Sequence, residues 1–269
     1  MTYDEFVIAV AYETSFNSKS GIADNSVRER ILEFGKQLNS DERDVYLHLI
    51  KKFVKIKWNE YELELNKALD SAKNGELKNK KIYISPMQTK TGSSAPYVLR
   101  FFAMSPLLNG HENLVGSQMN FCCEDIQLPR KISGNSNARL LLVDDYIGSG
   151  YTAFERVCDI QKKVSVLDNQ IILLAIAGSQ SGVEFLNHFY KIICPFIQSK
   201  GISSIQKESQ KEKFSKSIIT IAQKFNLEQA FGYRACEGTI SLMNTPNNTF
   251  QMFHDTKRVG NPPYPRIKL

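Results

Sequence analysis

Two long apolar runs in the second half of the chain limit its possible folds most strongly. The runs ARLLLVDD (138–145) and IILLAIAGS (171–179) are continuously apolar and do not alternate with polar residues. Continuous runs predict strands that are buried on both faces, as in a parallel sheet covered by helices. Shorter strands are expected at KIYISPM (81–87), at IIC (192–194) and at GTISLM (238–243), and one further apolar segment lies around Met119–Cys122. Because helical stretches separate these strands, we predict an α/β fold with a mainly parallel sheet.

The first 75 residues predict a small helical domain ahead of the sheet. N-capping residue types at 24–26 precede apolar residues at helical spacing, Ser40 and Asp41 precede a second such stretch, and a third runs over 58–69. This segment carries 11 Lys+Arg against 13 Asp+Glu, a net charge of −2. Because the whole chain has a net charge of +6, residues 76–269 carry +8. Three short helices could form a winged-helix module, but the acidic balance favours a helical cap or dimerisation layer. We expect domains at 1–75 and 76–269.

Composition argues for a globular cytoplasmic protein without a membrane partner. The chain is 42% hydrophobic and 23% charged, and no run approaches the roughly 18 apolar residues of a membrane span. Acids stand near the N-terminus where a signal peptide carries Lys or Arg. The five cysteines are odd in number and lack CxxC spacing, which argues against a zinc site or a disulfide framework.

The segment LLLVDDYIGSGYT (140–152) carries the predicted chemistry. An apolar strand ends in two acids, turns through two glycines and enters a helix, and ligands bind at such carboxyl ends of parallel strands. Gly148 and Gly150 let the backbone approach an anion, and successive amides with nearby hydroxyls form a phosphate nest. Asp144 and Asp145 would repel phosphate directly, so they suit sugar hydroxyls or a divalent cation. The combination fits a ribose 5-phosphate moiety.

Other glycine-rich motifs fit this segment less well. A Walker A loop requires a Lys after its last glycine, and none follows Gly150. A dinucleotide-binding fingerprint requires a third glycine, and a nucleophile elbow requires GxSxG spacing. A receiver-domain acidic pair requires a phosphoacceptor Asp after a later strand, and IILLAIAGS has none. An ordinary strand–helix turn with two exposed acids is disfavoured, because two acids, two glycines and two hydroxyls coincide at one junction.

This segment resembles the motif that binds 5-phosphoribosyl 1-pyrophosphate (PRPP) in type I phosphoribosyltransferases. The resemblance implies that Asp144 and Asp145 hold the ribose hydroxyls and form the catalytic pair. Mg²⁺ would arrive with PRPP or a nucleotide. The resemblance implies either that no protein side chain binds the ion directly or that the ion lies near Asp144 and Asp145. The loop around the 5-phosphate would comprise Ile147, Gly148, Ser149, Gly150, Tyr151 and Thr152.

A second resemblance extends over roughly residues 80–255. KGIS (200–203), FGY (231–233) and NTPNNTFQMFH (244–254), with the central motif, look like the phosphoribosyltransferase-like effectors of bacterial conflict systems, including retron antiphage systems. This implies an effector controlled by a defence-system protein or by a complex of reverse transcriptase and nucleic acid. The resemblance leaves open whether the protein also forms a homo-oligomer. Because NTPNNT follows an expected strand, its amides would read a base or a second phosphate at the same sheet edge. Those amides belong to Asn244, Asn247 and Asn248.

The rest of the motif set is less complete. The pyrophosphate loop should follow the first strand, and the candidate comprises Lys90, Thr91, Gly92, Ser93 and Ser94. Many purine phosphoribosyltransferases carry an acid where Gly148 stands, so acid–base catalysis on a purine lacks its usual group here. Among the four histidines, His254 lies just past the NTPNNT loop and is the one closest to an expected ligand.

Two functions follow from these features. In the first, the protein binds PRPP or a ribonucleotide with Mg²⁺ and makes or breaks a C1–N glycosidic bond as a defence effector. In the second, the same pocket is a non-catalytic sensor that signals through the N-terminal helices. Gly148 favours the second function, and the Asp144–Asp145 loop fits both.

Overall fold

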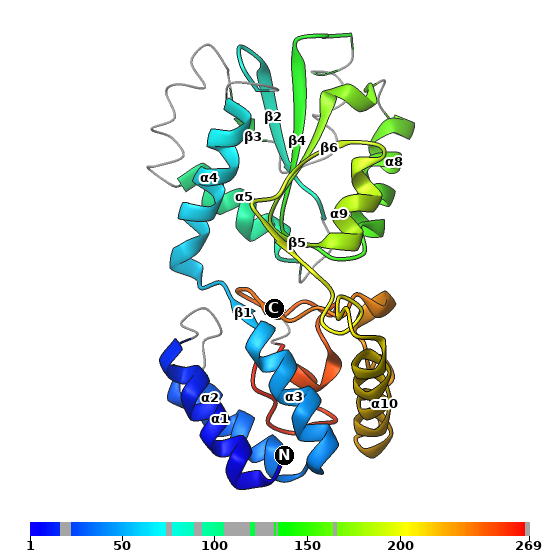
Figure 1. The fold of residues 1–269 in the computed structure, drawn as a ribbon. Helices are drawn as coiled ribbons and strands as arrows, with labels where there is room; N and C mark the ends of the chain where they lie inside the picture. Colours follow the sequence, from blue (N-terminus) through cyan, green and yellow to red (C-terminus); the bar gives the residue numbers. More distant parts are fainter. Residues whose placement is uncertain are drawn as a thin grey trace. The chain divides into compact units, whose positions relative to one another are not determined.

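The computed structural model describes residues 1–16, 23–73, 77–88, 93–104, 119–121, 132, 134–163 and 166–266. Backbone contacts divide the chain into two compact units (Figure 1). Unit 1 comprises Met1–Lys57 and Gln198–Lys268, and unit 2 is Trp58–Ile197. The chain therefore passes between the units twice, once after Lys57 and once after Ile197.

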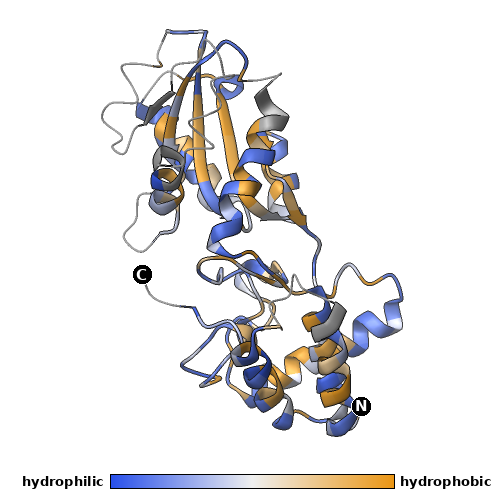
Figure 2. Cartoon of the chain, turned by 90° about the vertical axis from the view of Figure 1, so that its left-hand side faces the viewer, coloured by the Kyte–Doolittle hydropathy of each residue, from blue (hydrophilic) through white to orange (hydrophobic). Residues whose placement is uncertain are grey.

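Unit 2 contains the predicted parallel sheet. Its strand order is β3-β2-β4-β5-β6, with β7 pairing β5, and the ladders from β3 to β6 are parallel. The strands are β2 (Lys81–Pro86), β3 (Met119–Phe121), β4 (Ala138–Ile147), β5 (Ile171–Ser179), β6 (Lys191–Ile193) and β7 (Phe196–Gln198). All nine residues of β5 and nine of the ten in β4 are buried, and Figure 2 shows these strands in the hydrophobic colour. The sequence-based prediction of an α/β fold with a mainly parallel sheet is confirmed.

Helices cover both faces of this sheet. They are α4 (Tyr61–Lys73), α5 (Ala95–Met104), α8 (Tyr151–Lys163) and α9 (Gln180–Asn187). In Figure 1, α4 and α5 lie on one side of the sheet and α8 and α9 on the other. The connection after β2 leads to β3 at one edge, while the connection after β4 leads to β5 in the opposite direction. The strand order therefore reverses between β2 and β4, which is where open α/β sheets bind their ligands.

Unit 1 is built from helices around an aromatic core. The helices are α1 (Tyr3–Phe16), α2 (Asn25–Lys36), α3 (Ser40–Lys52) and α10 (Glu208–Lys224), and β1 (Val54–Lys55) pairs with β8 (Ile240–Ser241) in parallel. Phe53 stacks on Tyr264 with ring centres 3.8 Å apart and planes 5° apart. Phe34 and Phe253 both pack against the fully buried ring of Tyr46. Side chains from both ends of the chain thus share one core.

Short 3-10 helices complete the described structure at Trp58–Glu60, Asp168–Gln170, Tyr233–Ala235 and Gln251–Phe253. Cys158, Cys194 and Cys236 are free thiols, and the other two cysteines lie outside the described residues. Within the described ranges, no helix combines the length and the apolar character needed to cross a membrane.

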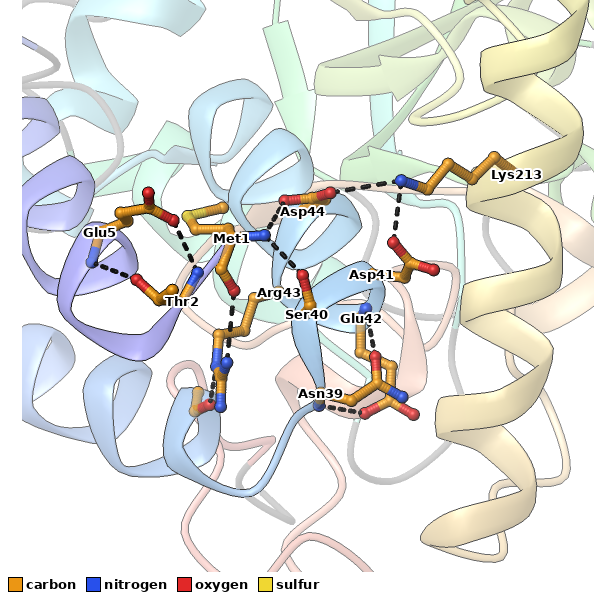
Figure 3. A network of polar contacts seen from close by, with 11 residues as sticks. Met1, Thr2, Glu5, Asn39, Ser40, Asp41, Glu42, Arg43, Asp44 and Lys213 are labelled. Atoms are coloured by element: carbon orange, nitrogen blue, oxygen red, sulfur yellow. Dashed lines mark hydrogen bonds and ion pairs between the residues drawn. The ribbon is translucent and has the colours of Figure 1, made fainter.

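A polar network on α3 ties it to α10 (Figure 3). The Lys213 ammonium on α10 lies 2.9 Å from Asp41 and 3.4 Å from Asp44 on α3. At the start of α3, Asn39 and Glu42 form a capping box, in which each side chain accepts a hydrogen bond from the other residue's backbone amide. The contacts of Lys213 join segments about 170 residues apart in sequence.

The observed division of the chain differs from the predicted boundary near residue 75. The helix expected over 58–69 exists as α4, but it belongs to unit 2, and residues 198–268 return to unit 1. The strand expected at GTISLM is β8, and it pairs with β1 in unit 1, so its prediction as part of the main sheet was wrong. The reason is physical: the parallel pairing of β8 and the packing of α10 on α3 are long-range contacts that local periodicity does not encode.

The motifs KGIS, FGY and NTPNNT form one hydrogen-bonded network in unit 1. Glu237, which is 5% exposed, accepts the amides of Ile202 and Ser203 at 2.8 and 2.7 Å through one carboxylate oxygen. The amide of Gly238 donates to the carbonyl of Asn248 at 3.0 Å, and a β-bridge joins Gly238 to Thr249. These motifs therefore hold segments of unit 1 together.

Replacing Glu237 should test this network. We expect Glu237→Ala to lower the free energy of unfolding by about 2 kcal/mol or more, because two amides lose a charged acceptor. Chemical denaturation of the full chain, followed by circular dichroism, measures the change. The matched control is Glu212→Ala on exposed α10 surface, which should stay within about 0.5 kcal/mol of wild type. Equal stability of the two variants would contradict the role assigned to Glu237.

Candidate functional site

The predicted acidic pair lies at the carboxyl end of β4, beside the reversal of strand order. β4 ends at Ile147 and α8 begins at Tyr151, so three residues form the turn between them. Asp144 and Asp145 are only 3% and 5% exposed. The hydrogen-bonded register pairs Val143 with Pro86, the last residue of β2. The segment that follows β2 therefore leaves the sheet next to the two acids.

Ser94 joins the segment after β2 to these acids. Its hydroxyl lies 2.6 Å from an oxygen of Asp145 and 3.2 Å from an oxygen of Asp144. The amide of Asp145 also donates to Asp144 at 2.8 Å. On α4, the hydroxyl of the fully buried Tyr61 lies 3.5 Å from the second oxygen of Asp145. Three separate segments of unit 2 thus meet at two carboxylates.

The electrostatic environment of the pair favours a retained proton. Burial and then the charge of Asp145 raise the pKa of Asp144 well above its usual range, and burial also raises the pKa of Asp145. Among the described residues, no Lys or Arg forms an ion pair with either carboxylate. Ser94 has one hydroxyl hydrogen for two acceptors, so a proton on Asp144 would let both contacts be hydrogen bonds. Within the described ranges, the two carboxylates therefore have few hydrogen-bond donors and no cationic partner.

The glycine turn after β4 is clamped to the start of α9. The Ser179 hydroxyl donates to the carbonyl of Gly148 at 2.6 Å and accepts the amide of Gly182 at 3.0 Å. Because a trans peptide directs its carbonyl and its N–H to opposite sides, this bond turns the Ser149 N–H away from α9. Gly182 has no room for a side chain, since a Cβ would lie 1.9 Å from the Gly148 oxygen. The clamp fixes the orientation of the turn.

The second glycine of the turn has a conformation that suits an anion-binding loop. Gly150 has a φ of +80°, which an L-residue with a side chain adopts only with strain, and a Cβ there would lie 2.9 Å from the carbonyl oxygen of Gly182. Next to it, the ring of Tyr151 stacks on Phe185 at 5.1 Å and 9°. The first-turn amides of a helix have no acceptor within the helix, so the start of α8 supplies donors beside the turn.

The residues of the site fit a metal ion that arrives with a substrate. Within the described ranges, no group of three or more His, Cys, Asp or Glu side chains gathers into a metal site. Mg²⁺ binds through one or two carboxylates together with substrate phosphates and waters, and Asp144 and Asp145 supply that number of carboxylates. The donor set therefore suits substrate-borne Mg²⁺ and does not form a complete protein cage.

Other predicted site residues divide between the two units. In the expected pyrophosphate loop, Ser94 contacts the acids and the Ser93 hydroxyl accepts the amide of Ala95 at 3.3 Å. Lys90, Thr91 and Gly92 lie outside the described residues. The NTPNNT loop follows β8 of unit 1 and not a strand of the main sheet, so the reason for expecting Asn244, Asn247 and Asn248 at the ligand edge of that sheet does not hold.

Within unit 1, this asparagine loop has structural contacts. The amide of Tyr233 donates to the carbonyl of Asn247 at 2.8 Å, and the Asn248 side chain donates to Tyr233 and to the Cys236 sulfur. The pKa of His254 falls to about 4, chiefly because of burial, and its Nε2 has no hydrogen-bond partner in the described part of the chain. A neutral His254 of this kind belongs to the packing of unit 1.

Three residues of the site were not found by sequence reasoning. Tyr61 stands in a segment with a helical pattern, and nothing in that pattern marks its contact with Asp145. Ser179 carries a local signal, because a serine directly after an apolar strand and before a helical stretch is typical of a helix N-cap, whereas Gly182 carries none. Their contact with the Gly148 turn depends on the pairing of β4 and β5 and could not be seen locally.

The parallel sheet with its acid-and-glycine turn at the strand reversal defines a phosphoribosyltransferase type of α/β protein. Comparison with known families agrees: the chain matches the PRTase-CE family over residues 31–265 and belongs to it. The match includes parts of both units. A comparison with curated proteins gives no match.

Gly182 offers a test of the clamp. We expect Gly182→Ala to lower the free energy of unfolding by about 2 kcal/mol or more, because the new methyl group would overlap the Gly148 carbonyl. Thermal or chemical denaturation measures this change. Gln180→Ala, at an exposed position of the same helix, is the control and should change stability by less than about 0.5 kcal/mol. A Gly182 variant as stable as this control would show that the turn is not held against α9.

The acidic pair also predicts a dependence of stability on pH. Both folded-state pKa values are raised, so the folded protein binds more protons than the unfolded chain above about pH 4, and stability falls as pH rises. Asp144→Asn removes this penalty and should raise the melting temperature at pH 8, with a smaller gain near pH 4. Asp159→Asn on exposed α8 surface is the control. A gain that does not change with pH would contradict the raised pKa.

Proposed function

We propose that this protein binds PRPP or a ribonucleotide together with Mg²⁺ and acts on a C1–N glycosidic bond. The observation that supports the proposal most directly is the buried Asp144–Asp145 pair beside the clamped glycine turn, at the strand reversal of a phosphoribosyltransferase-like fold. Carboxylates without cationic partners require hydrogen-bond donors, and adjacent hydroxyls of a ribose provide them in pairs. The turn and the start of α8 provide amides for a phosphate.

The proposed binding mode gives each segment one task. The ribose 2′- and 3′-hydroxyls donate to the two carboxylates, which replaces the hydration that burial removed. The 5-phosphate lies on the backbone of residues 147–152, where the Ser149 and Thr152 hydroxyls add donors. Ser94 and Tyr61 orient the acids, and Ser179 orients the turn. Because the acids hold the ribose hydroxyls and the turn holds the 5-phosphate, the C1 atom of the bound ribose would lie beyond the edge of the sheet.

The proposed chemistry is a displacement at C1. In the transferase direction the C1–O bond to pyrophosphate breaks, its electron pair leaves with the pyrophosphate, and a base nitrogen donates the pair that forms the C1–N bond. Mg²⁺, when bound with PRPP, would neutralise charge on the pyrophosphate. The protein holds the ribose in position and stabilises the positive charge that develops at C1 by two nearby carboxylates. Cleavage of a nucleotide is the same displacement in reverse: a pyrophosphate oxygen donates the electron pair that forms the C1–O bond, and the base leaves with the electron pair of the C1–N bond.

The proposed biological role is that of an effector in antiphage defence. It is supported by the resemblance of KGIS, FGY and NTPNNT to retron-associated and other conflict-system effectors. In that role a partner, either a defence-system protein or a reverse transcriptase with its nucleic acid, would keep the protein silent. Cytoplasmic location belongs to the same proposal.

A non-catalytic sensor is the second candidate. Gly148 stands where many purine phosphoribosyltransferases carry an acid, and the Ser179 contact uses its carbonyl for structure. A pocket without this acid can still bind PRPP or a nucleotide through Asp144, Asp145 and the turn. Binding without turnover would then be the signal.

One experiment separates the two candidates. The full chain is incubated with Mg²⁺, PRPP and a pool of bases and nucleotides, and products are followed by mass spectrometry and pyrophosphate release. We expect turnover that falls about a hundred-fold or more in Asp144→Asn/Asp145→Asn, because two charge-assisted contacts to the ribose are lost. Asp159→Asn should retain wild-type turnover.

The remaining outcomes are also informative. PRPP binding by calorimetry without turnover, lost in the double variant, would support the sensor and reject the enzyme. Neither binding nor turnover in the wild-type chain would reject both candidates.

A further inference from the structure

Unit 1 contains a pocket of about 270 Å³ that the proposed function does not use. It lies beside the carboxyl ends of β1 and β8, where Lys55 and Ser241 are the last residues of the two parallel strands. The start of α2 forms another wall through Asp24, Ser26 and Val27. All residues that line the pocket belong to unit 1.

Two cations and one carboxylate face this pocket. Arg30 and Lys55 line it, and Lys55 lies 3.9 Å from Asp24, at the outer limit of an ion pair. Among the described residues, the half-buried Arg30 side chain makes no hydrogen bond or ion pair. Hydrogen bonding from Ser26 lowers the pKa of Asp24, so the carboxylate is ionised at neutral pH. The pocket therefore has an excess of one positive charge.

The floor of the pocket presents a hydrogen-bond acceptor. The buried Thr245 hydroxyl donates to the carbonyl of Tyr264 at 2.8 Å, and Ser241 lies 3.0 Å from the Thr245 oxygen. With the Thr245 hydrogen used in this way, Ser241 donates to Thr245 and retains lone pairs on its own oxygen. Ser241 and Asp24 are then acceptors in the pocket lining, and Arg30 and Lys55 are its cationic donors.

The remaining walls suit a small carbon skeleton. Val27, Leu242, Met243 and Pro263 line the pocket with apolar atoms. Its volume is near the lower end of the range for small-molecule sites, which is roughly 300–1,000 Å³. Asp24 Oδ1 already accepts the amide and the hydroxyl of Ser26, so Asp24 Oδ2 and Ser241 are the acceptors left for a ligand. A purely cationic ligand would be repelled by the excess positive charge, and a bare anion would not use these two acceptors.

We propose that this pocket binds a sugar phosphate, with the phosphate at Arg30 and Lys55 and the sugar hydroxyls at Asp24 and Ser241. The inference does not rest on the proposed function, because it uses other residues in the other unit. It adds a second small-molecule site to the chain. The ligand occupancy of unit 1 would then depend on the concentration of a phosphorylated sugar.

The test is calorimetric titration of the full chain with ribose 5-phosphate, in an Asp144→Asn/Asp145→Asn background that weakens ribose binding in unit 2. We expect saturable binding that falls about ten-fold or more in Arg30→Gln and in Lys55→Gln, because each loses a charge-assisted contact to phosphate. Arg28→Gln, on the same helix but outside the pocket lining, is the matched control and should bind as the background does.

Asp24→Asn separates sugar phosphate from simple anion binding. Removing the carboxylate should weaken ribose 5-phosphate, because the sugar loses its charged acceptor, and should strengthen inorganic phosphate, because a repulsion is removed. Three results would each overturn the proposal: no saturable binding at about millimolar ligand, equal affinities in Arg30→Gln and Arg28→Gln, or inorganic phosphate binding as tightly as ribose 5-phosphate. Melting curves of every variant exclude loss of folding as the cause.

Discussion

The burial of β4 is the constraint on which the rest of unit 2 depends. This strand pairs in parallel with β2 on one edge and β5 on the other, and nearly every residue in it is buried. The residues that follow β4 therefore leave the sheet at the carboxyl end of this strand, beside the reversal of strand order. There the segment after β2 arrives through Ser94, α4 arrives through Tyr61, and α9 arrives through Ser179. The geometry of the site follows from the pairing of one strand.

The same burial places the two acids in an unfavourable environment before a ligand binds. A carboxylate taken out of water is stable only when donors or cations replace the lost hydration. Among the described residues, the contacts of Asp144 and Asp145 are the hydroxyls of Ser94 and Tyr61 and the Asp145 amide, and burial raises both pKa values. A ligand with two adjacent hydroxyls would supply the missing hydrogen-bond donors. The free energy that burial of the two carboxylates costs the free protein would then contribute to ligand binding. Strain of this kind is common where a fold serves a site.

Unit 1 shows that sequence motifs can have structural and functional meanings at once. KGIS, FGY and NTPNNT contribute to the resemblance with conflict-system effectors, yet their hydrogen bonds run mostly to one another through Glu237, Gly238 and Asn248. The family match extends over residues 31–265, a range that includes all three motifs. The ligand-binding capacity of unit 1 lies beside the network, in the pocket between α2 and the end of β8.

The sequence by itself determined the local elements and the residues of one turn. Continuous apolar runs predicted β4 and β5, capping residues predicted α2 and α3, and the order of acids and glycines predicted the turn between β4 and α8, because each of these signals lies within a few consecutive residues. The apolar α1 was missed, because it lacks a polar face and so shows no amphipathic period. Only the tertiary structure decided that α4 joins the sheet, that β8 pairs with β1, and that Ser179 and Gly182 orient the turn. Those outcomes depend on contacts between residues far apart in the chain, and a local pattern carries no information about which distant partner completes a core.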